Sequence, residues 1–153
     1  IRRTNRKITL SLSPGVEMTT DRSDHLKQNC ELFRISADFW DRWEDLKNQF
    51  ALCKMWAPYT GPGCWADADM LPLGHIGIRA ERGDDRQSLL THDEQNTLMT
   101  LWVMCRSPLM FGGDLPSNDA FTLSLLTNDE VSLPATWLNE ARDVVETVTN
   151  IDS

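Results

Sequence analysis

Residues 61–71, GPGCWADADML, form the most informative stretch of the chain. A Gly-Pro-Gly turn leads into Trp65, after which Asp67 and Asp69 alternate with small residues. Side chains of an extended segment alternate between two faces, so this spacing predicts both carboxylates on one face. A solvated acidic loop has the same pattern, but apolar neighbours such as Leu71 are usually buried and are not expected in such a loop. Paired carboxylates beside a Trp at a strand end favour a sugar or cation site.

The length and charge of the chain limit its class and its partners. The 153 residues correspond to one domain or to part of a larger one, and 41% hydrophobic with 25% charged residues is a globular composition. The net charge of −8 argues against nucleic acid and against an anionic membrane as partner. No apolar run approaches the roughly 18 residues of a spanning helix. A neutral ligand agrees with these properties without being required by them.

Cysteine and histidine spacing gives no sign of a metal centre. The four cysteines are Cys30, Cys53, Cys64 and Cys105. Their separations fit neither C-x-x-C nor a zinc cluster, and the three histidines lie far apart in the sequence. We interpret the cysteines mainly as buried thiols rather than as disulfides or metal ligands. No metal or other cofactor is therefore predicted.

Short apolar or β-branched runs alternate with helical stripes along the chain. The predicted strands are 7–12, 31–36, 64–69 and 108–111. The predicted helices are 24–30, 39–55, 92–105, 119–127 and 134–148. Thr91 and Glu94 form a capping box for the third long stripe, and Ser117 is placed to cap the next one. This βαβα order predicts an α/β fold with a parallel sheet or a barrel.

Three acids follow predicted strands, namely Asp38, Asp69 and Asp114. In a (β/α)8 barrel this end of the strands carries the active site, and four βα units amount to half of such a barrel. Asp114 alone is interpreted as a turn residue. The long connection 74–90 contains a charged run and no predicted element, and connections of this length are often functional. No glycine-rich phosphate-binding motif follows any strand.

Several separate motifs, in the right order, resemble glycoside hydrolase family 27, the α-galactosidases and α-N-acetylgalactosaminidases (melibiases). They are Arg34-x-x-x-Asp38, the 61–71 stretch, RSPL at 106–109, GDL at 113–115 and LLTNDEV at 125–131. The resemblance covers about 7–131 and is closest to the bacterial branch. It identifies residues 1–153 as part of a catalytic barrel, namely its C-terminal half with strands five to eight. Residues 132–153 diverge from the family and are predicted to form a helix.

The resemblance implies a retaining mechanism with two carboxylates, a carbohydrate substrate and no cofactor. The acid/base of the family corresponds to Asp38, and a sugar-binding arginine corresponds to Arg34. Asp69 and Met70 correspond to residues that hold the galactose. The family's nucleophile ends a K-x-D motif, which we expect upstream of this sequence. The fragment alone is therefore expected to be inactive.

The sequence also departs from the family at two places. Ser13 occupies the position that helps to select the group on C2, and a small side chain there leans toward N-acetylgalactosamine. Its neighbours Pro14 and Gly15 differ from the vertebrate pattern. Cys30 occupies the position of one half of a eukaryotic disulfide, and Leu12 replaces the other half.

Two alternatives remain open from the sequence. Asp38 without the family pattern could equally be the N-cap of the following helix. If it is the acid, Arg34 is expected to face the sugar, because a tight ion pair would lower the pKa of Asp38. The other alternative is a non-catalytic half-barrel that acts as a carbohydrate-binding or assembly module. Its open sheet edges would need the remainder of a barrel, or self-association, to cover them.

Overall fold

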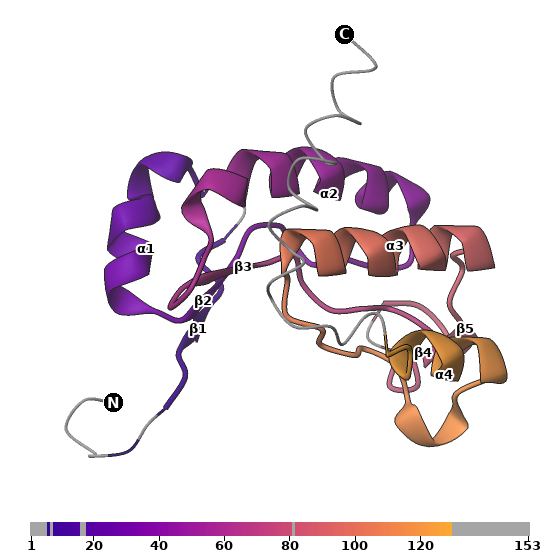
Figure 1. The fold of residues 1–153 in the computed structure, drawn as a ribbon. Helices are drawn as coiled ribbons and strands as arrows, with labels where there is room; N and C mark the ends of the chain where they lie inside the picture. The colour runs from indigo at the N-terminus through magenta and orange to yellow at the C-terminus, as the bar shows by residue number, and fades with distance from the viewer. Residues whose placement is uncertain (1–5, 7, 16–17, 81, 130–153) are drawn as a thin grey trace, which may run out of the picture.

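The computed structural model describes residues 6, 8–15, 18–80 and 82–129, and these residues form an α/β arrangement (Figure 1). Its parallel sheet has three strands in chain order, β1 (Ser11–Leu12), β2 (Leu32–Arg34) and β3 (Trp65–Asp67). Both strand pairs are parallel. The predicted parallel pairing is therefore confirmed for three strands, although each strand is shorter than its predicted range.

The predicted fourth strand at 108–111 is wrong. Among the described residues, its only ladder contact is an isolated parallel bridge between Leu71 and Phe111. The amide N–H of Met110 bonds the carbonyl of Pro108 at 3.1 Å, which folds this segment into a local turn. A strand cannot extend where its own N–H groups are used locally. Within the described residues, segment 108–111 thus extends the parallel sheet only through the bridge at Phe111.

The helices are α1 (Ser23–Asn29), α2 (Trp43–Trp56), α3 (His92–Cys105) and α4 (Ala120–Leu126), with short 3₁₀ turns η2 (Thr20–Arg22), η3 (Ala57–Tyr59) and η4 (Leu115–Ser117). The expected start of α2 at Phe39 is wrong, since Arg42 is its N-cap residue in an extended conformation. The N-cap alternative for Asp38 is wrong for the same reason. The N–H of Phe39 bonds a distant carboxylate at 2.7 Å, which keeps the preceding residues in a loop.

Local capping explains the other helix boundaries. The predicted capping box of α3 is confirmed, because the Thr91 N–H donates to Glu94 Oε2 at 2.7 Å and the Glu94 N–H donates to Thr91 Oγ1 at 3.3 Å. Ser117 does not cap α4. Asp119 does so instead, accepting the Thr122 N–H at 2.7 Å.

The core lies between the sheet and the two long helices, α2 and α3, which run side by side (Figure 1). Phe33 of β2 packs edge to face on Trp56 of α2, with 5.2 Å between the ring centroids. Phe39 packs on Trp102 of α3, with 4.9 Å between the ring centroids. The cysteines contribute to this core as free thiols: three are buried and Cys105 is half-buried. The interpretation as mainly buried thiols is therefore confirmed.

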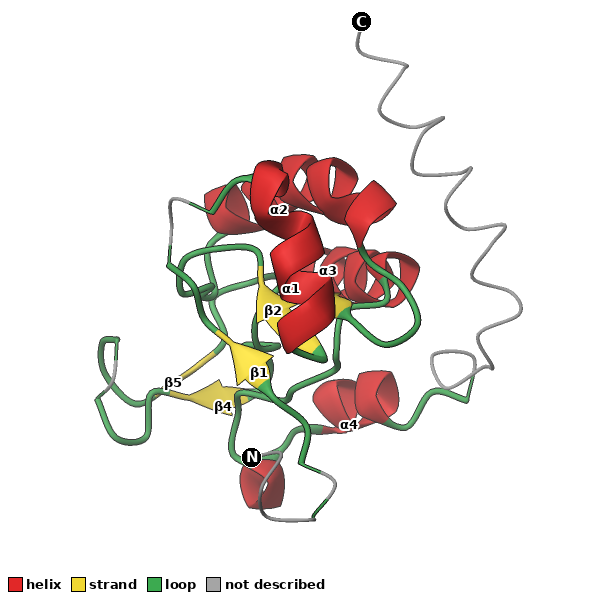
Figure 2. Cartoon of the chain, turned by 90° about the vertical axis from the view of Figure 1, so that its left-hand side faces the viewer, coloured by secondary structure: helices red, strands yellow, loops and turns green. Residues whose placement is uncertain are grey.

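The long connection 74–90 is not irregular throughout. It contains an antiparallel hairpin of β4 (His75–Ile76) and β5 (Arg86–Gln87), which forms a two-stranded sheet of its own. Figure 2 shows these two strands below β1. None of the helices in the described part of the chain has the length and hydrophobicity that crossing a bilayer requires. The predicted helix 134–148 lies outside the described residues.

Candidate active site

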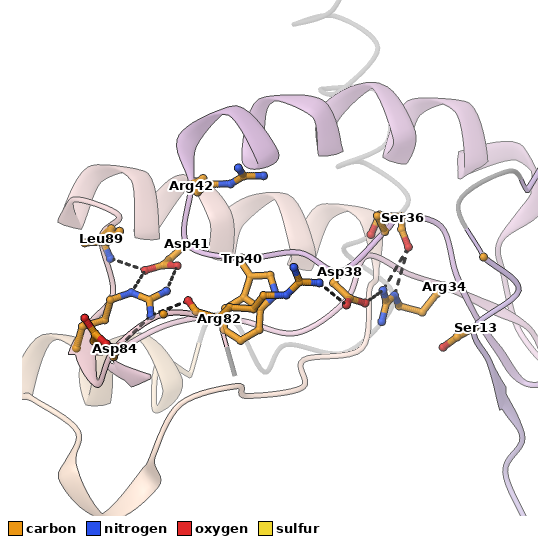
Figure 3. A pocket seen from close by; sticks show the side chains of 14 residues that line it. Ser13, Arg34, Ser36, Asp38, Trp40, Asp41, Arg42, Arg82, Asp84 and Leu89 are labelled. Carbon is orange, nitrogen blue, oxygen red and sulfur yellow. Dashed lines mark hydrogen bonds and ion pairs between the residues drawn. The ribbon is translucent and has the colours of Figure 1, made fainter. Parts of the chain in front are cut away.

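A cavity of about 1180 Å³ opens beside the carboxyl end of β2 (Figure 3). Its wall combines the chain after β1, the loop after β2 and the β4–β5 hairpin. The charged and aromatic residues of the wall are Arg34, Asp38, Trp40, Asp41, Arg42, Arg82, Asp84 and Arg86. Parallel strands place such a site where their carboxyl ends meet.

Arg34, the last residue of β2, joins two of the predicted site residues. Its Nη2 lies 2.9 Å from Asp38 Oδ1, and its Nη1 lies 3.1 Å from Asp69 Oδ1. The guanidinium is largely enclosed, with 18% of the Arg34 side chain exposed, whereas 61% of the Asp38 side chain is exposed. The structure therefore brings Arg34, Asp38 and Asp69 together at one end of the sheet.

Asp69 lies beyond the end of β3, so strand alternation does not determine where its side chain points. Its backbone is left-handed, with a φ of 83°. Its N–H donates to Asp67 Oδ1 at 2.8 Å, and its carbonyl accepts the indole N–H of Trp102 at 2.8 Å. These contacts fix a turn that directs the Asp69 carboxylate toward Arg34 and the Phe39 N–H.

The electrostatics of this cluster correct one expectation. The hydrogen bond and the charge of Arg34 lower the pKa of Asp38, and Arg82 acts in the same direction. The expectation that Arg34 faces the sugar rather than the acid is therefore wrong for this structure. Asp67 behaves in the opposite way, because burial raises the pKa of its carboxyl more than the hydrogen bond from the Asp69 N–H lowers it.

A second charged pair, which sequence reasoning missed, fixes the far wall of the cavity. Arg86 of β5 donates from Nη2 to Asp41 Oδ1 at 2.6 Å and from Nε to Asp41 Oδ2 at 3.1 Å. The Leu89 N–H adds a third bond to Asp41 Oδ2 at 2.9 Å. Burial alone would raise the pKa of Asp41, but these donors outweigh it and lower that pKa. The charged run in the long connection was the available signal.

The remaining predicted site residues are placed differently. Ser13 lines the same cavity as Arg34 and Asp38, whereas Asp69 and Met70 are outside its lining. The Met70 sulfur packs on Gly112, where a Cβ would approach it to 2.6 Å. Trp40 was also missed, although an aromatic residue two positions after a strand-end Asp was visible in the sequence. Its Nε1 is buried, with no hydrogen-bond partner among the described residues.

Trp65 and Asp114, which the sequence also singled out, both contact other protein side chains. Trp65 carries the Arg106 guanidinium 5.7 Å from its ring centre. Asp114 accepts the Ser117 hydroxyl at 2.6 Å, which confirms its interpretation as a turn residue. Among the described residues, no group of three or more His, Cys, Asp or Glu side chains is arranged to hold a metal ion.

Comparison with known proteins gives consistent relatives. The family model described as "Alpha galactosidase A" matches residues 1–133. Alpha-galactosidase 2 of Arabidopsis thaliana is 32% identical, over 65% of this chain and 22% of its own length. Alpha-N-acetylgalactosaminidase of Rattus norvegicus is 30% identical, also over 65% of this chain and 22% of its own length.

A solved structure agrees with these sequence matches. The family 27 β-L-arabinopyranosidase of Geobacillus stearothermophilus superposes with a TM-score of 0.81 at 54% identity, over 85% of this chain and 30% of that one. The chain thus spans about a fifth to a third of the length of these three proteins. Family model, curated relatives and solved structure agree, and the chain belongs to glycoside hydrolase family 27.

Proposed function

We propose that this chain supplies the acid/base side of the active site of a retaining glycoside hydrolase, which removes terminal α-linked galactose or N-acetylgalactosamine. The observation that carries the proposal is the convergence of Arg34, Asp38 and Asp69 beside a cavity of about 1180 Å³ at the carboxyl end of the parallel sheet. Barrel enzymes place their catalytic groups at this end of the strands.

In this proposal Asp38 is the general acid and base. Arg34 pairs with Asp38 and Asp69 and so orients both carboxylates, and it also lines the cavity that receives the sugar. Asp69 and Met70 lie outside the cavity lining of the described residues, and in this proposal they hold the galactose ring where the rest of the barrel extends the site. Ser13 lies near the substituent on C2. The nucleophile comes from a strand that precedes β1, with its carboxylate about 5–5.5 Å from Asp38, as in other retaining enzymes. A second carboxylate at that distance would raise the pKa of Asp38 against the effect of Arg34, which favours the protonated acid.

The proposed parent is a complete (β/α)8 barrel, of which this chain forms the C-terminal half. Within the described residues, β1 and β3 each pair only with β2, so both edges of the sheet have no strand partner. An unpaired edge invites association with another chain. The remainder of the barrel would cover these edges, and self-association is the other way to do so.

A β-L-arabinopyranoside is the second candidate substrate. It is favoured by the 54% identity with an enzyme described as a β-L-arabinopyranosidase, a variant of which was crystallised in complex with arabinose. A β-L-arabinopyranosyl ring has the ring configuration of an α-D-galactopyranosyl ring but lacks the hydroxymethyl group. The same Arg34, Asp38 and Asp69 constellation could therefore serve both, and the substituent at C5 would decide between them.

The test uses the full-length protein and three p-nitrophenyl glycosides: α-D-galactopyranoside, N-acetyl-α-D-galactosaminide and β-L-arabinopyranoside. We expect release of nitrophenol from at least one of them, and proton NMR should detect the retained anomer as the first product. Inversion would contradict the two-carboxylate retaining mechanism. Absence of turnover together with saturable sugar binding would favour the non-catalytic carbohydrate-binding half-barrel.

A further inference from the structure

The two oxygens of the Asp38 carboxylate contact two different arginines. Arg34 Nη2 lies 2.9 Å from Oδ1, and Arg82 Nη2 lies 3.4 Å from Oδ2. Figure 3 shows Asp38 between these two guanidinium groups, which reach it from opposite sides of the cavity. Arg34 belongs to the strand β2, whereas Arg82 belongs to the turn of the β4–β5 hairpin. A segment 44 residues away therefore reaches the proposed acid/base.

The hairpin turn is held in place by the buried pair of Arg86 and Asp41. While its Nε and Nη2 bond Asp41, Arg86 donates from Nη1 to the carbonyls of Arg82 and Asp84, each at 3.1 Å. Gly77 allows the close approach of the two sides, since a Cβ there would lie 2.6 Å from the Asp84 carbonyl oxygen. The position of Arg82 is thus set by a fixed backbone.

The two arginines are bound to Asp38 with unequal strength. Arg34 is 18% exposed and also pairs with Asp69, so it is held from two sides. Arg82 is 61% exposed, and its contact with Asp38 is the longer one. An exposed pair of this kind is weak and screened by salt. Of the two partners, Arg82 is the one that a substrate can displace.

A general acid must offer one carboxyl oxygen to the leaving group, and here Oδ1 is already engaged by Arg34. We propose that Arg82 is a positioning residue for the acid/base carboxyl of Asp38, which holds Oδ2 in the resting site and leaves it when the aglycone enters. This inference rests on the proposed function. The proton then passes from Oδ2 to the glycosidic oxygen as the bond between that oxygen and the anomeric carbon breaks and the nucleophile bonds the same carbon. In the second half, water displaces the nucleophile and gives a proton to Oδ2.

The other charged groups of this wall are engaged elsewhere or lack an ion pair to Asp38. Arg42 pairs with Asp45 and Arg86 pairs with Asp41, while Asp69, which lies beside the wall, pairs with Arg34. Asp84 also lines the cavity, and the pKa of Arg86 is raised by the Asp41 hydrogen bond, to which the charge of Asp84 adds. Arg34 and Arg82 are the cations whose contacts lower the pKa of Asp38.

The test is the pH profile of kcat/KM of the full-length protein on an aryl glycoside that it cleaves, with Arg82→Gln and Arg82→Lys. Loss of the cation should move the alkaline limb of Arg82→Gln to higher pH, with about a two- to fivefold gain in kcat/KM above the wild-type limb. Arg82→Lys should return the limb toward wild type. Added salt should move the limb of the wild type more than that of Arg82→Gln. Arg42→Gln, a cavity arginine paired with Asp45, is the control and should leave the limb in place.

A second measurement separates this inference from the proposed function. The carboxyl carbon resonance of Asp38, assigned with Asp38→Asn in the same full-length protein labelled with ¹³C-aspartate, reports its pKa without turnover. Hydrolysis with an unmoved limb and an unmoved resonance in Arg82→Gln would overturn the positioning role and leave the proposed function standing. A shifted resonance in a protein that cleaves no glycoside would support the Arg82 contact and contradict the glycosidase. An equal shift of the Asp38 resonance in Arg42→Gln would also overturn the positioning role of Arg82, because the shift would then follow from the net charge of the protein and not from the contact with Arg82.

Discussion

The backbone N–H of Phe39 donates to Oδ2 of Asp69 at 2.7 Å, across 30 residues of chain. The residue that follows Asp38 is therefore anchored directly to the turn after β3. With Arg34 on its other oxygen, the Asp69 carboxylate positions the whole loop that carries the proposed acid. The Asp69 carboxylate therefore binds other groups of the protein, namely the Arg34 guanidinium and the Phe39 N–H, in addition to its proposed contact with the sugar.

Substitutions of Asp69 should separate its charge from its backbone conformation. Asn tolerates the φ of 83° and can still accept the Phe39 N–H, so Asp69→Asn should fold and lose mainly the Arg34 pair. Asp69→Val adds a β-branched residue in the left-handed region, which costs about 1–2 kcal/mol more in the free energy of unfolding. Urea unfolding of the two variants measures the difference. Equal losses would mean that the backbone is not strained by the larger side chain.

The acid/base role of Asp38 predicts a dependence on the leaving group. In the full-length protein, Asp38→Ala should reduce kcat/KM by about 10²–10⁴-fold for poor leaving groups and much less for activated aryl glycosides. A good leaving group needs little protonation. Added azide should partly restore turnover, because it attacks the glycosyl-enzyme without help from a base. Equal losses on both kinds of substrate, with no azide effect, would exclude Asp38 as the acid/base.

The Asp41–Arg86 pair should contribute strongly to stability. Only 2% of the Asp41 side chain is exposed, so Arg86→Leu leaves a buried carboxylate with the Leu89 N–H as its remaining strong donor. Removing one partner of a buried pair costs about 3 kcal/mol in the free energy of unfolding. Arg42→Leu is the matched control, because it breaks a bidentate pair with Asp45 from a 72% exposed side chain. If both variants lose the same stability, burial does not strengthen the Asp41–Arg86 pair.

Asp41 and Asp67 should respond to pH in opposite directions, although each residue is 3% exposed. The folded-state pKa of Asp41 is lowered, so its stabilisation is complete above the ordinary value of 3.8 and is lost as pH falls through the folded pKa. The folded-state pKa of Asp67 is raised, so its stabilisation is present below 3.8 and is lost as pH rises through the folded pKa.

Replacing each of the two by Asn tests this contrast. At pH 7 Asp41→Asn should lower the free energy of unfolding, because it removes a favourable buried charge. Asp67→Asn should raise it or leave it unchanged, because it removes an unfavourable charge and still offers an oxygen to the Asp69 N–H. Urea unfolding between pH 3 and 8 gives the pH dependence of the free energy of unfolding for each variant. A loss of stability at pH 7 from Asp67→Asn as large as that from Asp41→Asn would contradict the opposite shifts.

The sequence was most informative where the structure depends on neighbouring residues. The boundaries of α3 follow from a capping box whose two residues are three positions apart, and its predicted range agrees with the observed one. The parallel strands follow from short apolar runs whose pairing needs no particular partner side chain. Arg34 and Asp38 were expected in one site because both lie at the end of a predicted strand and match the family pattern.

The errors arise where one residue is fixed by another that is distant in the sequence. Helical periodicity extended α2 back to Phe39, but the bond to Asp69 keeps that segment in a loop. The β4–β5 hairpin pairs the polar β5 with β4, a pattern that hydrophobic alternation does not detect. The Asp41–Arg86 pair joins residues 45 positions apart, and nothing local marks either as a partner of the other.

That separation has a consequence for synthesis of the chain. At about 5–20 residues per second, Asp41 leaves the ribosome about 2–9 s before Arg86, which lies 45 residues later. Burying Asp41 during that interval would leave an unpaired charge in the interior, which is strongly unfavourable. We therefore expect the nascent loop after β2 to stay hydrated while α2 already forms. The cavity wall then closes only when the second strand of the hairpin emerges.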